Sequence, residues 1–207
     1  MSETKELILS EDFNPEKFAV EASNSETILD DLLALIHEKQ EKIRFNSYET
    51  LRFVSESNPE KLYSKWNKLE YLLTLKNNYL KFIGINLLGN LVAVDTEKLF
   101  EKCFEKYYGI LREEVTIAPA YVVRNSWKIV QAKPHLESQI TDLLLRLDAI
   151  HPGKQIAMIK GEAIETFDHY FEISNNRAGI LKFVRDQLES PSPKARKLAK
   201  TFLEKWE

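Results

Sequence analysis

The chain has 207 residues, of which 43% are apolar and 29% charged, and a formal net charge of −3. This length and composition are sufficient to bury a continuous hydrophobic core. Only 6 glycines and 7 prolines are present, which disfavours a turn-rich β-protein and favours helices. The mildly acidic balance argues against a nucleic-acid binder, because such proteins typically need a clearly basic face.

The sequence also carries signals about its compartment. Cys103 is the single cysteine, so no internal disulfide can form. The first residues lack the basic and then apolar pattern of a secretory signal, and no apolar run reaches the roughly 18 residues of a membrane span. We therefore expect a soluble, cytoplasmic protein.

Charge is distributed unevenly along the chain. Residues 1–40 hold 3 lysines and 10 acidic residues, whereas residues 191–207 hold 5 basic and 2 acidic residues. Within the first 22 residues a few apolar side chains, such as Phe13 and Phe18, stand among the acids. We expect residues 1–22 to be an N-terminal acidic cap or a mobile segment, and residues 23–207 to be a single HEAT-like helical repeat domain.

Apolar spacing, capping residues and prolines predict ten helices in five pairs. Ser23 and Glu26 are spaced as a capping box for the first helix, and Asp95 and Ser192 are expected N-caps of later ones. In chain order, the helices are expected at Ser25–Glu38 and Lys42–Ser55, from Pro59 and near Asn77, after Asp95 and from Pro119, from Pro134 and over Lys154–Ile173, and at Arg177–Leu188 and after Ser192.

The pairs repeat at a fixed interval. Leu73, Ile110, Leu147 and Val184 follow one another every 37 residues. The same interval relates Leu62, Leu99 and Leu136, and the pairs Leu51/Leu88, Trp127/Ile164 and Val130/Phe167. It also places Cys103 between Trp66 and Ile140, which predicts a buried apolar position for the thiol. A repeated helical hairpin is therefore expected to stack on its neighbours and share one core.

Short motifs carry a resemblance to a known repeat class. Leu147-Asp148, Val123-Arg124 and the segment Ser192–Ala199 are similar to the leucine-aspartate and valine-arginine features of a HEAT unit. Most of the other hairpins lack the loop aspartate and the inner arginine. The resemblance covers about residues 25–207 and implies an all-α fold, a right-handed α-α superhelix of about five helical hairpins of the HEAT/armadillo type.

No residue cluster supports a catalytic site, so we expect no catalytic residue, no cofactor and no metal ligand set. Glycine-rich phosphate loops and His-Glu-x-x-His motifs are both absent from the sequence. One weaker alternative is a metal site formed by Glu162, Glu165 and His169, which share one helix face, if a second helix supplied a further ligand. A solvated polar face explains the same spacing.

The second helices of successive hairpins should line one surface, and such surfaces commonly bind partners. The polar and aromatic residues expected on that inner face are Arg44, Tyr48, Lys81, Asn86, Asn90, Tyr121, Arg124 and Lys128. The leading hypothesis is a non-catalytic protein-binding scaffold or adaptor whose partner is a charged helix or an extended peptide.

Two other classes stay open. The first is a nucleic-acid-binding protein similar to the HEAT-like DNA alkylation-repair glycosylases, for which Trp127, Asp168 and Tyr170 are the available residue types; the net charge disfavours it. The second is a structural subunit that self-associates through the exposed ends of an open array. The sequence does not reveal the oligomeric state.

Overall fold

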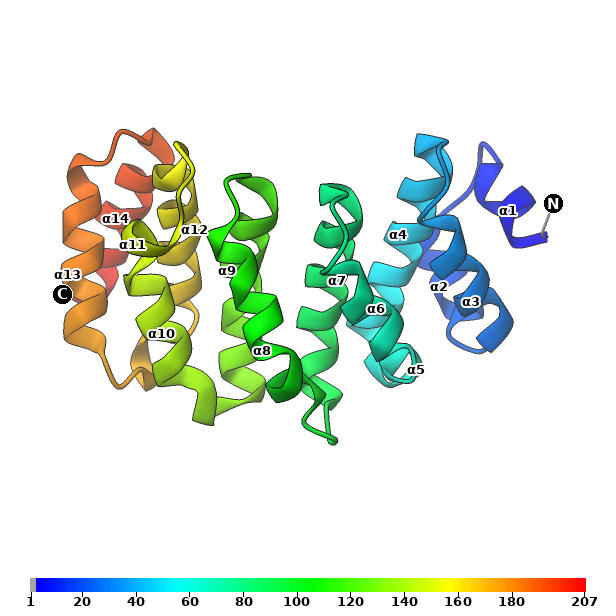
Figure 1. Ribbon diagram of the computed structural model, residues 1–207, viewed down its shortest axis with the longest axis horizontal. Coiled ribbons are helices and arrows are strands. Elements are labelled where there is room, and N and C mark those ends of the chain that lie inside the picture. The colour runs from blue at the N-terminus through cyan, green and yellow to red at the C-terminus, as the bar shows by residue number, and fades with distance from the viewer. Residues whose placement is uncertain (1–2) are drawn as a thin grey trace. The chain divides into compact units, whose positions relative to one another are not determined.

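The computed structural model describes residues 3–207, which form α-helices and short 3₁₀ helices without any strand (Figure 1). The chain divides into two compact units, unit 1 up to Glu101 and unit 2 over Lys102–Glu207, and α8 (Leu99–Gly109) crosses the boundary between them. The predicted all-α class is confirmed. Across the described residues, no helix is both long enough and apolar enough to span a membrane.

Unit 1 contains the first two predicted hairpins. Helices α3 and α4 form the first, and α7 is the second helix of the next. The first helix of that next hairpin is split at Ser64 and Lys65 into two shorter helices, α5 and α6. The bounds are α1 (Glu3–Leu9), α2 (Pro15–Ala22), α3 (Glu26–Leu35), α4 (Glu41–Ser57), α5 (Pro59–Tyr63), α6 (Trp66–Leu72), α7 (Asn78–Leu91) and the 3₁₀ helix η1 (Val92–Val94).

The acidic N-terminal segment is helical in its described part. Helices α1 and α2 pack on α3 and α4, and α2 lies along α4 as one second helix lies along the next. Asn46 Nδ2 donates to the Ile8 carbonyl at 2.7 Å, and Lys42 Nζ donates to the Leu9 carbonyl at 2.8 Å. Residues 3–22 thus form an additional hairpin on unit 1. Residues 1 and 2 of the predicted cap lie outside the described residues.

The first cap lies two residues later than predicted. Ser25, not Ser23, caps α3, because its Oγ accepts from the Ile28 N–H at 3.3 Å. Ser23 instead ends α2, and its Oγ donates to the Ala19 carbonyl at 2.7 Å. The capping-box spacing could not reveal this, because a preceding helix that uses Ser23 was not foreseen. The predicted N-cap Ser192 is confirmed, because its Oγ accepts from the Ala195 N–H at 3.3 Å. Asp95 lies four residues before the first residue of α8, but its carboxylate still caps that helix by accepting from the Leu99 and Phe100 N–H groups at 2.9 Å.

Unit 2 holds the remaining hairpins. Helix α12 packs against both α9 and α14, so these three second helices lie side by side (Figure 1). The bounds are η2 (Ile110–Arg112), α9 (Ile117–Ala132), η3 (Pro134–Leu136), α10 (Glu137–Leu145), α11 (Leu147–Ile150), α12 (Ile156–Asp168), η4 (Phe171–Ile173), α13 (Arg177–Asp186), η5 (Gln187–Glu189) and α14 (Pro193–Trp206).

Burial follows the 37-residue interval closely. Leu73, Ile110, Leu147 and Val184 are all buried. Cys103 is a buried free thiol, as its place in the ladder predicted. A fully buried aliphatic side chain of this kind contributes about 1.5–3 kcal/mol to the free energy of unfolding. The repeat therefore marks the core positions of the hairpins.

A buried carboxylate links two hairpins of unit 2. Glu137, at the start of α10, is only 3% exposed. Its oxygens accept hydrogen bonds from Ser174 Oγ at 2.7 Å, Thr141 Oγ1 at 2.8 Å and Asn175 Nδ2 at 2.9 Å. Ser174 and Asn175 lie in the loop before α13, so the carboxylate joins the first helix of one hairpin to that of the next.

The pKa of Glu137 gives the stability of the fold a defined pH dependence. Burial alone would raise this pKa, but the hydrogen bonds from Ser174 and Thr141 outweigh burial and lower it. The stabilisation is therefore complete above the unfolded-state value of about 4.3 and is lost as the pH falls through the lower folded-state pKa. Glu137→Gln should lower the free energy of unfolding by about 1–3 kcal/mol at pH 7, because the new amide NH₂ group would face hydrogen-bond donors that now bind the carboxylate. Urea unfolding at pH 7 and pH 4 measures this cost.

The difference in unfolding free energy between the wild type and Glu137→Gln should shrink at pH 4. The matched control is Glu172→Gln, in which the same change is made at an exposed carboxylate of the same unit. Equal stability of Glu137→Gln and Glu172→Gln at pH 7 would contradict the buried network.

Glycine at position 84 is required by close packing of α7 on α6. A Cβ at Gly84 would lie 2.9 Å from the Leu69 carbonyl oxygen and 2.9 Å from Leu72 Cβ. Gly84→Ala should therefore lower the unfolding free energy by about 1–3 kcal/mol through overpacking. Gly109→Ala is the control, because a Cβ there has no neighbour within 4 Å, and it should be neutral or stabilising. Thermal unfolding of both variants tests this, and a fully stable Gly84→Ala would disprove it.

Candidate functional site

The predicted inner-face residues of unit 1 lie on α4 and α7, but two of them are not available at the surface. Tyr48 is 6% exposed and Lys81 is 7% exposed. Tyr48 packs its ring 5.0 Å from that of Phe82, and α7 is buried around most of its circumference. The expectation that Tyr48 and Lys81 are surface residues is therefore wrong.

The other three predicted residues of unit 1 are partly exposed and make contacts within the unit. Asn90 Nδ2 donates to Ser55 Oγ at 2.8 Å, and Asn86 Nδ2 donates to the Phe82 carbonyl at 2.8 Å. The Arg44 guanidinium donates to the Lys39 carbonyl and lies 5.4 Å from the centre of the Tyr79 ring. Asn90 thus joins α7 to α4, whereas the Asn86 bond lies within α7, and the role of all three residues in binding stays a prediction.

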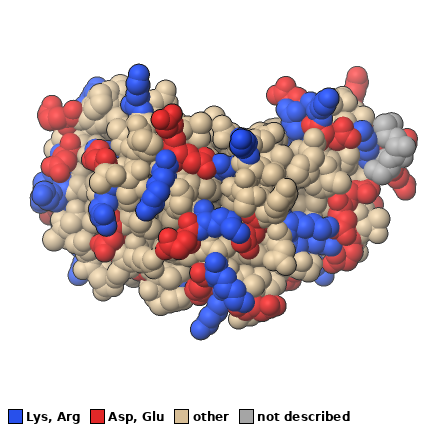
Figure 2. All heavy atoms as spheres, viewed as in Figure 1, with Lys and Arg blue, Asp and Glu red and all other residues tan. Residues whose placement is uncertain are grey.

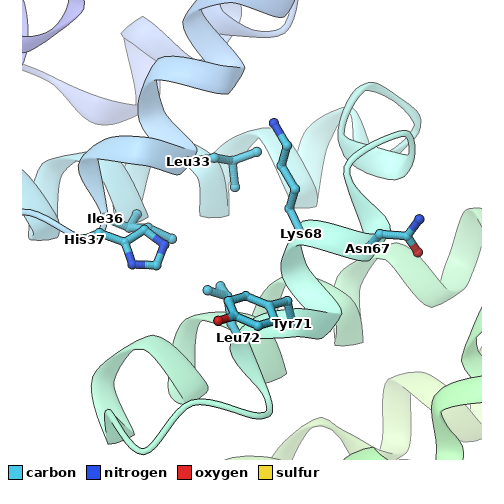
Figure 3. Close-up of a pocket in the computed structure, with 7 residues that line it drawn as sticks. All are labelled: Leu33, Ile36, His37, Asn67, Lys68, Tyr71 and Leu72. Carbon is cyan, nitrogen blue, oxygen red and sulfur yellow. The ribbon is translucent and has the colours of Figure 1, made fainter.

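Unit 1 also has an outer cleft between α3 and α6, which we call the α3–α6 cleft (Figure 3). Its volume is about 360 Å³. Its largely exposed ring, Tyr71, lies beside Leu72, opposite Ile36 and His37. The lining residues are Leu33, Ile36, His37, Asn67, Lys68, Tyr71 and Leu72. No sequence pattern indicated this cleft, because its apolar residues also belong to the core stripes of their helices.

Two larger hollows lie on the second helices of unit 2 and meet at Lys194; together we call them the unit 2 groove. The first measures about 490 Å³ and the second about 500 Å³. The first is lined by Arg124, Trp127, Glu165, Thr166, Asp168, His169, Lys194 and Leu198. The second is lined by Lys154, Gln155, Ala157, Met158, Glu162, Pro191, Ser192, Pro193 and Lys194.

An ion network runs across the groove where the hollows meet. Glu162 accepts from Arg124 Nε at 2.8 Å and from Lys194 Nζ at 3.0 Å, and Lys194 also donates to Glu165 at 2.9 Å. Burial alone would raise the pKa of Glu162, but the hydrogen bonds from Arg124 and Lys194 outweigh it and lower the pKa. The network connects α9, α12 and α14 through charged side chains.

Aromatic side chains form the far end of the groove. The Trp127 and His169 rings stack with centroids 4.2 Å apart and planes 16° apart. Beside them, Asp168 accepts from Lys205 Nζ at 2.9 Å and from Trp206 Nε1 at 2.6 Å. The groove therefore offers flat ring surface next to charged side chains that are held in ion pairs.

Of the three predicted residues in unit 2, Arg124 lines the groove and two lie at its border. The Arg124 guanidinium is 4.7 Å from the centre of the Tyr121 ring, and Lys128 Nζ is 5.9 Å from the centre of the Trp127 ring. The 37-residue interval placed Trp127 on an apolar stripe, at the position equivalent to Ile164, but Trp127 is partly exposed and its ring stacks on His169. Apolar spacing places Trp127 on the stripe, but it does not indicate which edge of the stripe is exposed to solvent.

The two alternative sites fare differently. Trp127 and Asp168 share the groove, but Tyr170 is buried and its hydroxyl pairs with Thr141 Oγ1 at 2.9 Å. The three residue types expected for a glycosylase-like site are therefore not together. In the metal alternative, both carboxylates bind Lys194. Within residues 3–207, no group of three or more His, Cys, Asp or Glu side chains is arranged to hold a metal ion.

Comparisons with known proteins identify the fold. No protein-family model and no curated protein matches the sequence. Among solved structures, an engineered protein is similar at 16% identity and a TM-score of 0.57, with 99% of this chain and 98% of that chain covered. A designed armadillo repeat protein in complex with the peptide (KR)4 is similar at 15% identity and a TM-score of 0.53 over the full length of both chains.

A second designed armadillo repeat protein has 15% identity and a TM-score of 0.50, with 99% of this chain and 98% of that chain covered. At these identities the likeness concerns the fold alone. The chain has the armadillo/HEAT-like helical repeat fold that the sequence predicted.

Proposed function

We propose that this chain is a non-catalytic, cytoplasmic protein-binding scaffold, and that the unit 2 groove holds an extended peptide segment of its partner. The observation that carries the proposal is the pair of hollows along α12 and α14, which share Lys194 as a lining residue. Two hollows that share a lining side chain offer room for consecutive side chains of one extended segment. A repeat fold of this kind supports the proposal, because a designed armadillo repeat protein has been solved with a peptide.

The lining fits this role chemically. Trp127 and Met158 offer partly or largely exposed apolar surface in the two hollows. Aromatic and methionine side chains of this kind commonly carry most of the binding energy in protein interfaces. Arg124 and Lys194 are about half exposed, and each has N–H donors beyond those that bind Glu162, so both can bind an incoming polar group without leaving that carboxylate.

The face shown in Figure 2 does not favour the nucleic-acid alternative. On the face shown in Figure 2, basic and acidic side chains are interspersed, without a continuous basic area. A duplex of nucleic acid would require such an area. The α3–α6 cleft is smaller than either hollow of the unit 2 groove, and we use its exposed Tyr71 as a control position.

A display library of random twelve-residue peptides tests the proposal. Peptides enriched on the wild-type chain should bind Trp127→Ala at least tenfold more weakly in fluorescence anisotropy, since the variant loses the stacked ring that lines the first hollow. Tyr71→Ala is the matched control, because it removes an exposed ring from the α3–α6 cleft. Circular dichroism should show equal helicity in both variants.

Two outcomes would overturn the proposal. One is that no peptide is enriched above the background of the support. The other is that the enriched peptides bind Trp127→Ala and the wild type equally well, which would place the interaction outside the groove.

A further inference from the structure

The two compact units carry opposite net charge. Unit 1 contains 12 lysines and arginines against 18 aspartates and glutamates, a net charge of −6, whereas unit 2 contains 17 against 14, a net charge of +3. The overall charge of −3 conceals this difference. A segment that approaches unit 2 therefore meets a positive field, although the protein as a whole is acidic.

Within the unit 2 groove, the basic groups are more accessible than the central acid. The Glu162 side chain is 10% exposed, whereas those of Arg124 and Lys194, which bind it, are 49% and 52% exposed. One buried carboxylate thus holds two half-exposed cations. Each cation has donors left over, because a guanidinium has five N–H groups and an ammonium three. An incoming group meets these donors before it meets Glu162.

The second hollow adds a cation that has no acidic partner. Lys154 is exposed and makes no hydrogen bond or ion pair with any residue in the described range 3–207. Around it lie apolar surfaces from Met158, Pro191 and Pro193, and the Met158 side chain is among the most exposed large apolar side chains of the chain. An ammonium group beside these apolar side chains suits a ligand with a carboxylate next to a large aliphatic side chain.

We infer that the partner segment of the unit 2 groove is acidic, with an aliphatic side chain against Met158 and carboxylates close to Lys154, Lys194 and Arg124. The inference rests on the proposed function and specifies its partner. The charge proposed for this segment is opposite to that of the basic peptide (KR)4 in the structure of the designed armadillo repeat protein. Charge complementarity of this kind sets the selectivity and the association rate more than the affinity.

A nucleic acid also carries negative charge, but the groove fits it less well. Glu165 and Asp168 line the first hollow with partly exposed carboxylates, which would repel a regular row of phosphates. A peptide can place its acids at the cations and its neutral residues at Glu165 and Asp168. A phosphate backbone cannot leave such gaps.

Defined probes separate these possibilities. Fluorescein-labelled hexapeptides Asp-Leu-Asp-Asp-Leu-Asp, Lys-Leu-Lys-Lys-Leu-Lys and Asp-Ala-Asp-Asp-Ala-Asp, and a labelled 20-base-pair DNA duplex, are titrated with the full chain by anisotropy at low and at physiological salt. The Asp/Leu peptide should bind at least tenfold more tightly than either of the other peptides and than the duplex. Its affinity should fall with salt, since exposed charges are screened.

A charge reversal locates the binding. Lys154→Glu should weaken binding of the Asp/Leu peptide about tenfold. Lys182→Glu is the matched control, because it makes the same change at an exposed lysine of α13 outside the groove, and it should leave the affinity within twofold of the wild type. Lys154 has no partner in the fold, so its reversal is not expected to unfold the chain.

The outcomes are distinct. Tighter binding of the Lys/Leu peptide, abolished by Trp127→Ala, would overturn the acidic partner and leave the peptide-binding scaffold standing. Tighter binding of the duplex with a steep salt dependence would replace both with a nucleic-acid role. Equal effects of Lys154→Glu and Lys182→Glu, or no binding of any probe, would also overturn the acidic partner, and the display experiment decides separately whether the groove binds peptides at all.

Discussion

Every hairpin of this chain has an apolar stripe that only a neighbouring hairpin can cover, and the rest of the structure depends on that requirement. The 37-residue interval of buried side chains, with Leu147 and Val184 as its last members, expresses it in the sequence. Once the core positions are taken by the stripes, the polar faces of α9, α12 and α14 are left to form a groove.

The periodic part of the fold could be predicted from the sequence. Burial recurs every 37 residues, and a helix cap depends on residues close to it in the chain. Cys103 is buried as its ladder indicated, and Ser192 caps α14. Local reasoning failed where one helix end depends on another. Ser23 looked like the N-cap of α3, but it ends α2. Helix α2 has a start signal of its own, because Asn14 Oδ1 accepts from the Lys17 N–H and Pro15 is the first helical residue, but the predicted helices began only at Ser25.

The candidate site was only partly predictable, for a physical reason. Apolar spacing indicates that a side chain lies on a stripe but not whether it lies at the centre or the edge. Tyr48 proved central and is covered by Phe82, whereas Trp127 proved to be at the edge and stacks on His169. Arg124 was recognised by its charge. The pairing of Lys194 with Glu162, 32 residues away, depends on the packing of α14 on α12 and has no local signature.

The carboxylate of Glu137 has a consequence for motion. It holds the backbone N–H of Asn175 as well as side chains of the same loop, at the entrance to α13. Helix α13 is therefore tethered to α10 through the loop at its N-terminal end. Its amide protons should exchange with solvent in step with those of α10, so that this end of the chain opens as one cooperative block rather than helix by helix.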